Sequence, residues 1–171
     1  MLKVKEVPVP EASSLLRTLK AVHFSDAYQT RCNSKLNVQD AYEAIFGHSP
    51  QWIRSLLTVR GVVASTLGLK HVADGDFSRA PGETYQITQR VGLFSVQSIE
   101  ANELIVGDND KHLDFRISIY RSSTNGVEMV TVSTAVEIHN AVGHLYMLVV
   151  KPFHRLIARS MLQKATNAGR L

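Results

Sequence analysis

The chain has 171 residues, of which 44% are hydrophobic, enough to build the buried core of a single domain. Its net charge of +4 comes from 19 basic and 15 acidic residues spread along the whole length, without the run of like charges that marks a nucleic-acid-binding arm. The composition therefore predicts one domain over residues 1–171 and argues against a nucleic-acid partner.

Cys32 is the only cysteine, so the chain cannot form an internal disulfide. A reduced, cytoplasmic setting is the simplest interpretation, and we expect a buried, unreactive thiol. The first residues lack the apolar segment of a secretory signal, and no uncharged apolar stretch reaches the roughly 20 residues that cross a bilayer. We therefore expect a cytoplasmic protein without a membrane span.

The first part of the chain predicts a strand and several helices. Asn37 suits the N-cap of one helix, and Ser49-Pro50 suits the cap and first residue of the next. In chain order we expect a short helix at 11–20, a strand at 22–32, helices at 38–46 and 49–70, and a loop at 74–83.

After residue 84 the hydrophobic period becomes twofold, which is the pattern of β-strands. Short turns such as Ala101-Asn102 and Thr124-Asn125-Gly126 predict antiparallel pairing in sequence order. Strands are expected at 85–90, 93–100, 103–109, 112–122, 127–139 and 144–150, and Lys151-Pro152 is expected to end the last of them and start an amphipathic helix.

These elements predict an α+β protein. A curved antiparallel sheet of six or seven strands would wrap around a long C-terminal helix, from about Phe153 to Asn167. A helix held against the concave face of a curled sheet often leaves a pocket between the two.

Four short segments also carry a family resemblance: Ser49-Pro50-Gln51-Trp52, Arg60 to Lys70, Asp110 to Arg116, and Val136 to Arg155. Together they resemble an uncharacterised bacterial family, known only as a domain of unknown function, within the START and birch-pollen-allergen superfamily. The resemblance implies a helix-grip fold with a ligand cavity. It implies no catalytic residue.

One polar cluster is predicted on the sheet. The strand at 112–122 alternates apolar residues with His112, Asp114 and Arg116, and the following strand would bring Glu137 and His139 beside them. Such residues can bind a divalent metal or transfer protons. The solvated face of a sheet buried on one side has the same alternation, and we prefer that interpretation. We therefore expect neither a metal nor a cofactor.

Five residues are candidates for the wall of the expected cavity: Trp52, Tyr146, Phe153, His154 and Ser160. Trp52 and Tyr146 suit a pocket or an ordinary core. His154 and Arg155 would lie in the first turn of the last helix, where the helix dipole disfavours positive charge. A carboxylate from the sheet is the expected partner, with a bound anion as the alternative.

Three functions remain open. The first is a module that binds a small, mainly apolar, lipid-like molecule between the sheet and the last helix. The second is an enzyme of the cyclase, dehydratase or hydrolase type, which needs a titratable side chain pointing into the same cavity. The third is an interaction domain that forms a homodimer.

Overall fold

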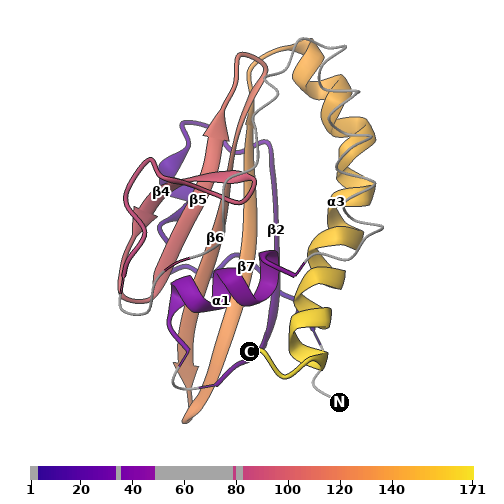
Figure 1. The fold of residues 1–171 in the computed structure, drawn as a ribbon. Coiled ribbons are helices and arrows are strands. Elements are labelled where there is room, and N and C mark those ends of the chain that lie inside the picture. Colours follow the sequence, from indigo (N-terminus) through magenta and orange to yellow (C-terminus); the bar gives the residue numbers. More distant parts are fainter. Residues whose placement is uncertain (1–3, 34–35, 49–78, 80–82) are drawn as a thin grey trace.

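A computed structural model describes residues 4–33, 36–48, 79 and 83–171 of the chain. The helix expected at 49–70, with Trp52, and most of the loop expected at 74–83 lie outside the described residues. The described part is an antiparallel sheet with a long helix, α3 (Ala141–Asn167), lying lengthwise along one face (Figure 1). This arrangement confirms the predicted α+β class.

The sheet has seven strands in the order β1-β2-β7-β6-β5-β4-β3, and all neighbours are antiparallel. The strands are β1 (Lys5–Glu6), β2 (Phe24–Arg31), β3 (Arg90–Val91), β4 (Phe94–Ile99), β5 (Glu103–Asn109), β6 (Leu113–Thr124) and β7 (Val127–Ile138). Because Asn125 and Gly126 adopt positive φ angles of 53° and 76°, the turn matches the right-handed twist of the long β6–β7 hairpin.

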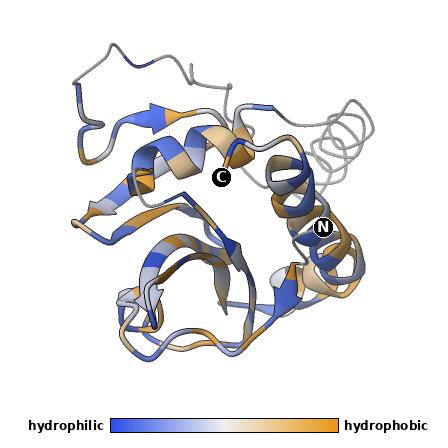
Figure 2. Ribbon diagram, turned by 90° about the horizontal axis from the view of Figure 1, so that it is seen from below, coloured by the Kyte–Doolittle hydropathy of each residue, from blue (hydrophilic) through white to orange (hydrophobic). Residues whose placement is uncertain are grey.

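Helix α1 (Val38–Phe46) forms as the sequence predicts. The Asn37 side chain accepts hydrogen bonds from the backbone of Gln39 and Asp40, which satisfies two free donors of the first turn. The buried Tyr42 hydroxyl donates to the Val91 carbonyl at 2.7 Å and ties the helix to the sheet edge. Figure 2 shows α1 and α3 on the same side of the sheet, and we call this side the inner face.

Three predicted elements differ in the structure. The strand expected at 85–90 is largely a turn, because Thr88 has a φ of 70° and only Arg90–Val91 pairs with β4. The helix expected at 11–20 is reduced to one 3₁₀ turn, η1 (Leu15–Thr18).

The strand expected at 144–150 is helical, and α3 continues through Pro152. One local feature and one long-range contact explain the early start of α3. The Asn140 side chain caps the Gly143 backbone N–H at 3.2 Å, and Gly143 lies so close to β6 that a Cβ there would be 2.3 Å from the His112 carbonyl oxygen. The apolar residues at 144–150 suit a buried strand and a packed helix equally well, so their spacing in the sequence does not distinguish the two.

The inner face holds two clusters of buried apolar residues. The larger cluster lies beneath α1 and the C-terminal half of α3, and it includes Ile117, Ile119 and Leu162. The smaller lies beneath the start of α3 and consists of Phe24, Leu113, Val136, Tyr146 and Met147. The predicted apolar row of β6 therefore faces the helices.

The opposite, outer face is partly covered by the segment that includes η1. Glu103, only 3% exposed, accepts hydrogen bonds there from the Ser13 and Ser118 hydroxyls. Its second oxygen accepts from the Ser14 backbone N–H at 2.8 Å and the Ser14 hydroxyl at 2.7 Å. Burial alone would raise the pKa of Glu103, but these hydrogen bonds outweigh it and hold the pKa below its ordinary value.

Candidate functional site

An acidic residue interrupts the inner face of β2. Because side chains alternate along a strand, Phe24, Asp26 and Tyr28 point to the same side, toward α3. The Asp26 side chain is only 2% exposed and lies beside Thr134 of β7, which is also buried. A carboxylate this deeply buried needs hydrogen-bond partners.

His154 of α3 supplies one of them. Its Nε2 atom lies 3.4 Å from Asp26 Oδ1, and its ring meets the Phe24 ring edge-on, with centroids 5.9 Å apart. Asp26 is thus a sheet carboxylate of the kind expected beside His154. The sequence predicted that His154 lies in the first turn of the last helix, and this prediction was wrong. His154 lies in the middle of α3, so the helix dipole does not explain its pairing with Asp26.

The other carboxylate oxygen of Asp26, Oδ2, is not hydrogen-bonded to His154. Among the described residues Oδ2 is buried and has no hydrogen-bond partner. Burial, followed by the nearby Asp26 carboxylate and a weaker hydrogen bond to it, raises the pKa of Tyr28 to about 12, so the adjacent phenol is neutral at neutral pH and donates weakly to Asp26. Buried acceptors of this kind are usually satisfied by an ordered water or a bound donor.

Several apolar side chains near this pair are only partly buried. Phe115 on the central strand β6 contacts both apolar clusters, yet it is only half-buried. Val150 and Ile157, which lie on either side of His154 along α3, are half-buried as well. Side chains along the middle of the α3–sheet contact are therefore less completely buried than Tyr146 and Leu162 toward its two ends.

Basic side chains surround the same place. The Lys151 ammonium lies 5.1 Å from the centre of the Phe24 ring, and the Arg155 guanidinium lies 6.0 Å from it. Helix α3 carries four lysines and arginines and no acidic residue. The rim next to Asp26 is consequently positive, and it lies over an aromatic surface.

The other predicted wall residues are separated in the structure. Tyr146 is 4% exposed and belongs to the smaller apolar cluster, and Ser160 is half-buried on α3. Phe153 is 49% exposed, so about half of this residue is accessible to solvent. Trp52 lies outside the described residues.

The predicted polar cluster is only partly assembled. The register of β6 and β7 places Asp114 opposite Glu137, and ligand atoms of Asp114, Glu137 and His139 lie within 4.8 Å of one another. His112 is separate, since its Nδ1 atom lies 3.0 Å from the Asn140 side chain at the start of α3. Arg116 is 7% exposed, so the expectation of a solvated face is wrong at that residue.

This cluster is held by hydrogen bonds from the backbone and by the contact of His139 Nε2 with Asp114 Oδ2, which lie 3.5 Å apart. Glu137 accepts a hydrogen bond from the Lys20 backbone at 2.9 Å, and Asp114 accepts one from the Asp110 backbone at 3.1 Å. Burial lowers the pKa of Arg116, and Asp114 is among the carboxylates that oppose this shift. The absence of a metal at this cluster stays a prediction, and the positive charge of the nearby buried Arg116 supports it.

The two histidines allow a direct test of this interpretation. We expect His139→Gln to change the free energy of unfolding by no more than about 0.5 kcal/mol, because His139 is exposed, and His112→Gln to cost about 1 kcal/mol, because its ring contacts the Asn140 cap of α3. Urea unfolding measures these changes. Zinc should not raise the melting temperature of the wild type, and stoichiometric zinc binding that is lost when both substitutions are combined would contradict the assignment.

Cys32 is half-buried rather than fully buried. Burial raises the pKa of its thiol, so little thiolate exists at neutral pH. The thiol is therefore expected to react slowly.

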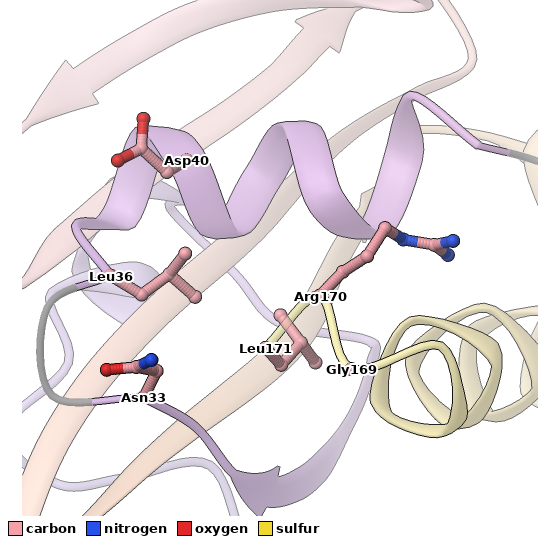
Figure 3. A pocket seen from close by; sticks show the side chains of 6 residues that line it. All are labelled: Asn33, Leu36, Asp40, Gly169, Arg170 and Leu171. Atoms are coloured by element: carbon pink, nitrogen blue, oxygen red, sulfur yellow. The ribbon is translucent and has the colours of Figure 1, made fainter.

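A separate shallow depression lies near α1. It has a volume of about 170 Å³ and is lined by Asn33, Leu36, Asp40, Gly169, Arg170 and Leu171 (Figure 3). Its residues come from the segment before α1, from α1 itself and from the segment after α3. It is thus distinct from the cavity that the sequence predicts between the sheet and the last helix.

Sequence reasoning missed Asp26, although a signal was present. In the strand predicted at 22–32 a charged residue shares the face of Phe24 and Tyr28, and such an acid within an apolar row points to a buried polar site.

The sequence of the chain matches a protein family. No curated protein matches the chain. Among the described residues no helix has both the length and the apolar character needed to cross a membrane. The family described as "Protein of unknown function (DUF2867)" matches residues 18–161, a range that holds Asp26, His154 and six of the seven strands. The chain therefore belongs to the DUF2867 family.

Proposed function

We propose that the protein binds a small, mainly apolar, lipid-like molecule between the inner face of the sheet and α3, in the manner of START-like helix-grip domains. The observation that carries this proposal is the buried Asp26 carboxylate, with one oxygen facing His154 and the other unpaired among the described residues. Apolar walls with a few convergent polar groups are typical of ligand sites.

The half-buried inner residues would form the walls of this site. Phe115 would cover the ligand from the sheet, with Val150 and Ile157 on the helix side. Tyr146 would close one end and Ser160 would lie toward the other. Phe153 would contact a ligand only at the rim, and Trp52 stays a prediction from the sequence.

A cavity-filling substitution tests the proposal. The neutral fluorescent probe N-phenyl-1-naphthylamine is expected to bind the wild type saturably, and Ile157→Phe should weaken its binding at least about tenfold by occupying the same space. Fluorescence titration measures the affinity. Leu148→Phe is the matched control, because Leu148 is 74% exposed on the same helix.

Two results would contradict the proposal. One is the absence of saturable probe binding to the folded wild type. The other is equal probe affinity of Ile157→Phe and wild type, which would place the probe elsewhere.

An enzyme is the second candidate, because a carboxylate that contacts an imidazole is the arrangement that orients a general base. The Asp26–His154 pair provides such a contact at 3.4 Å. A copurifying molecule, identified by native mass spectrometry, would be extracted and incubated with fresh protein. A change in the mass of this molecule produced by the wild type but not by His154→Gln would support an enzyme of the cyclase, dehydratase or hydrolase type. An unchanged mass would favour the binding function over the enzyme.

Self-association is the third candidate, and exposed residues on α3 favour it. Five of the nine large hydrophobic side chains that are exposed in the described part of the chain lie at helical spacing on this helix: Leu145, Leu148, Val149, Phe153 and Leu156. Light scattering would show a dimer that Leu148→Glu dissociates and Leu16→Glu does not. A monomeric wild type would exclude this function.

A further inference from the structure

The second oxygen of Asp26 indicates what kind of polar group a ligand must carry. An ionised carboxylate only accepts hydrogen bonds, so the group that satisfies Oδ2 must be a donor. The side chain is 2% exposed, which leaves bulk water little access to compensate for a poor match. The complementary ligand atom is therefore a hydroxyl or N–H group.

The surrounding charges narrow the choice further. A ligand carboxylate would place a second negative charge beside Asp26 in a site of low dielectric constant, where like charges repel strongly. A ligand ammonium would lie among His154, Lys151 and Arg155. A charged ligand of either sign meets a like charge as well as an opposite one and must also lose its hydration, whereas a neutral donor meets no like charge.

We propose that the ligand is a neutral amphiphile whose hydroxyl group donates a hydrogen bond to Asp26 Oδ2, and that the site selects alcohols against fatty acids and other carboxylates. This inference rests on the proposed function, because it names the polar end of the molecule held between the sheet and α3. His154 acts as a positioning residue that holds Asp26 through its other oxygen.

Two competitors that differ only in the polar group test the selectivity. At about pH 8 para-butylbenzyl alcohol is neutral and para-butylbenzoate is ionised. Each is titrated against bound N-phenyl-1-naphthylamine on the full chain. We expect the alcohol to displace the probe at a concentration at least about tenfold lower than the benzoate, which is the size of one hydrogen bond to a charged group.

The isosteric change Asp26→Asn removes the charge and keeps the shape. We expect it to weaken the alcohol, strengthen the benzoate and bring their ratio close to one. Asp114→Asn is the matched control, because Asp114 lies on the outer face, and its ratio should equal that of the wild type. Probe affinity and the melting curve of each variant show whether it is folded.

The outcomes separate this inference from the function on which it rests. Saturable probe binding with equal displacement by both competitors, or with a ratio that Asp26→Asn leaves unchanged, would overturn the selectivity while the binding function stands. Absence of saturable probe binding to the wild type would overturn both. Preference for the alcohol that Asp26→Asn abolishes and Asp114→Asn retains would support the inference.

Discussion

A chain that ends at Val150 is expected to lose cooperative unfolding altogether. The cut removes residues 151–167, more than half of α3, which supply Met161, Leu162 and Ala165 to the larger apolar cluster. Leu162 and Ala165 are fully buried, so their removal exposes much of the inner face to water. Circular dichroism during heating and the soluble fraction after expression measure the effect.

A point substitution gives a graded version of the same test. Leu162→Ala should lower the free energy of unfolding by about 3 kcal/mol, the usual cost of a large cavity at a fully buried leucine. Leu148→Ala is the control, because Leu148 is 74% exposed on the same helix and should cost less than about 0.5 kcal/mol. A sharp melting transition in the truncated chain would show that α3 is peripheral to the fold.

Local signals predicted much of the sheet. The strand expected at 103–109 matches β5, and the turn at Asn125-Gly126 pairs β6 with β7 in the register that places Asp114 opposite Glu137. Asn37 marked the start of α1 correctly. In each case residues close in sequence decide the conformation, so single-sequence reasoning was sufficient.

The errors occur where distant segments decide. Gly143 lies against the carbonyl of His112, the residue before β6, and this contact adds to the Asn140 cap in favouring a helix that the apolar run alone does not specify. Polar alternation along β6 predicted a solvated face, but Ser118 and Arg116 are buried there. Alternation identifies a polar face and cannot tell water from a covering segment of the same chain.

The candidate site shows the same limit. His154 was a candidate from the sequence, but its partner Asp26 lies 128 residues away in the chain. Asp26 is on β2, which pairs with β7 in the sheet. Only the position of α3 on the inner face brings Asp26 and His154 together. The residues adjacent to Asp26 and His154 in the sequence form no pattern that predicts this contact.

Glu103→Ala is expected to cause a loss of about 3 kcal/mol in the free energy of unfolding, because it leaves buried hydroxyls without an acceptor. Ser118 is fully buried, Ser13 is 4% exposed, and both donate to the same carboxylate oxygen. The Ser14 backbone N–H loses its partner as well, which would loosen the segment leading into η1. Urea unfolding near neutral pH measures the loss.

Two further variants test the cause of this loss of stability: Glu103→Gln, which keeps the shape of the side chain, and Glu100→Ala, which is the control. Glutamine keeps the shape but turns one acceptor into a donor, which conflicts with a serine donor and should cost about 1–2 kcal/mol. Glu100 is exposed on the neighbouring turn, and its replacement should cost less than about 0.5 kcal/mol. Equal stability of Glu103→Ala and wild type would show that the network contributes nothing.

The same carboxylate predicts how stability responds to acid. Because the pKa of Glu103 is lower in the folded chain than the value of about 4.3 expected when unfolded, its contribution is complete above that value and is lost as pH falls through the folded pKa. The wild type should therefore lose more stability than Glu103→Gln when the pH is lowered from about 6 to about 3. Parallel stability curves for the two proteins across this range would contradict the assignment, since a depressed pKa that only the wild type carries must steepen its curve.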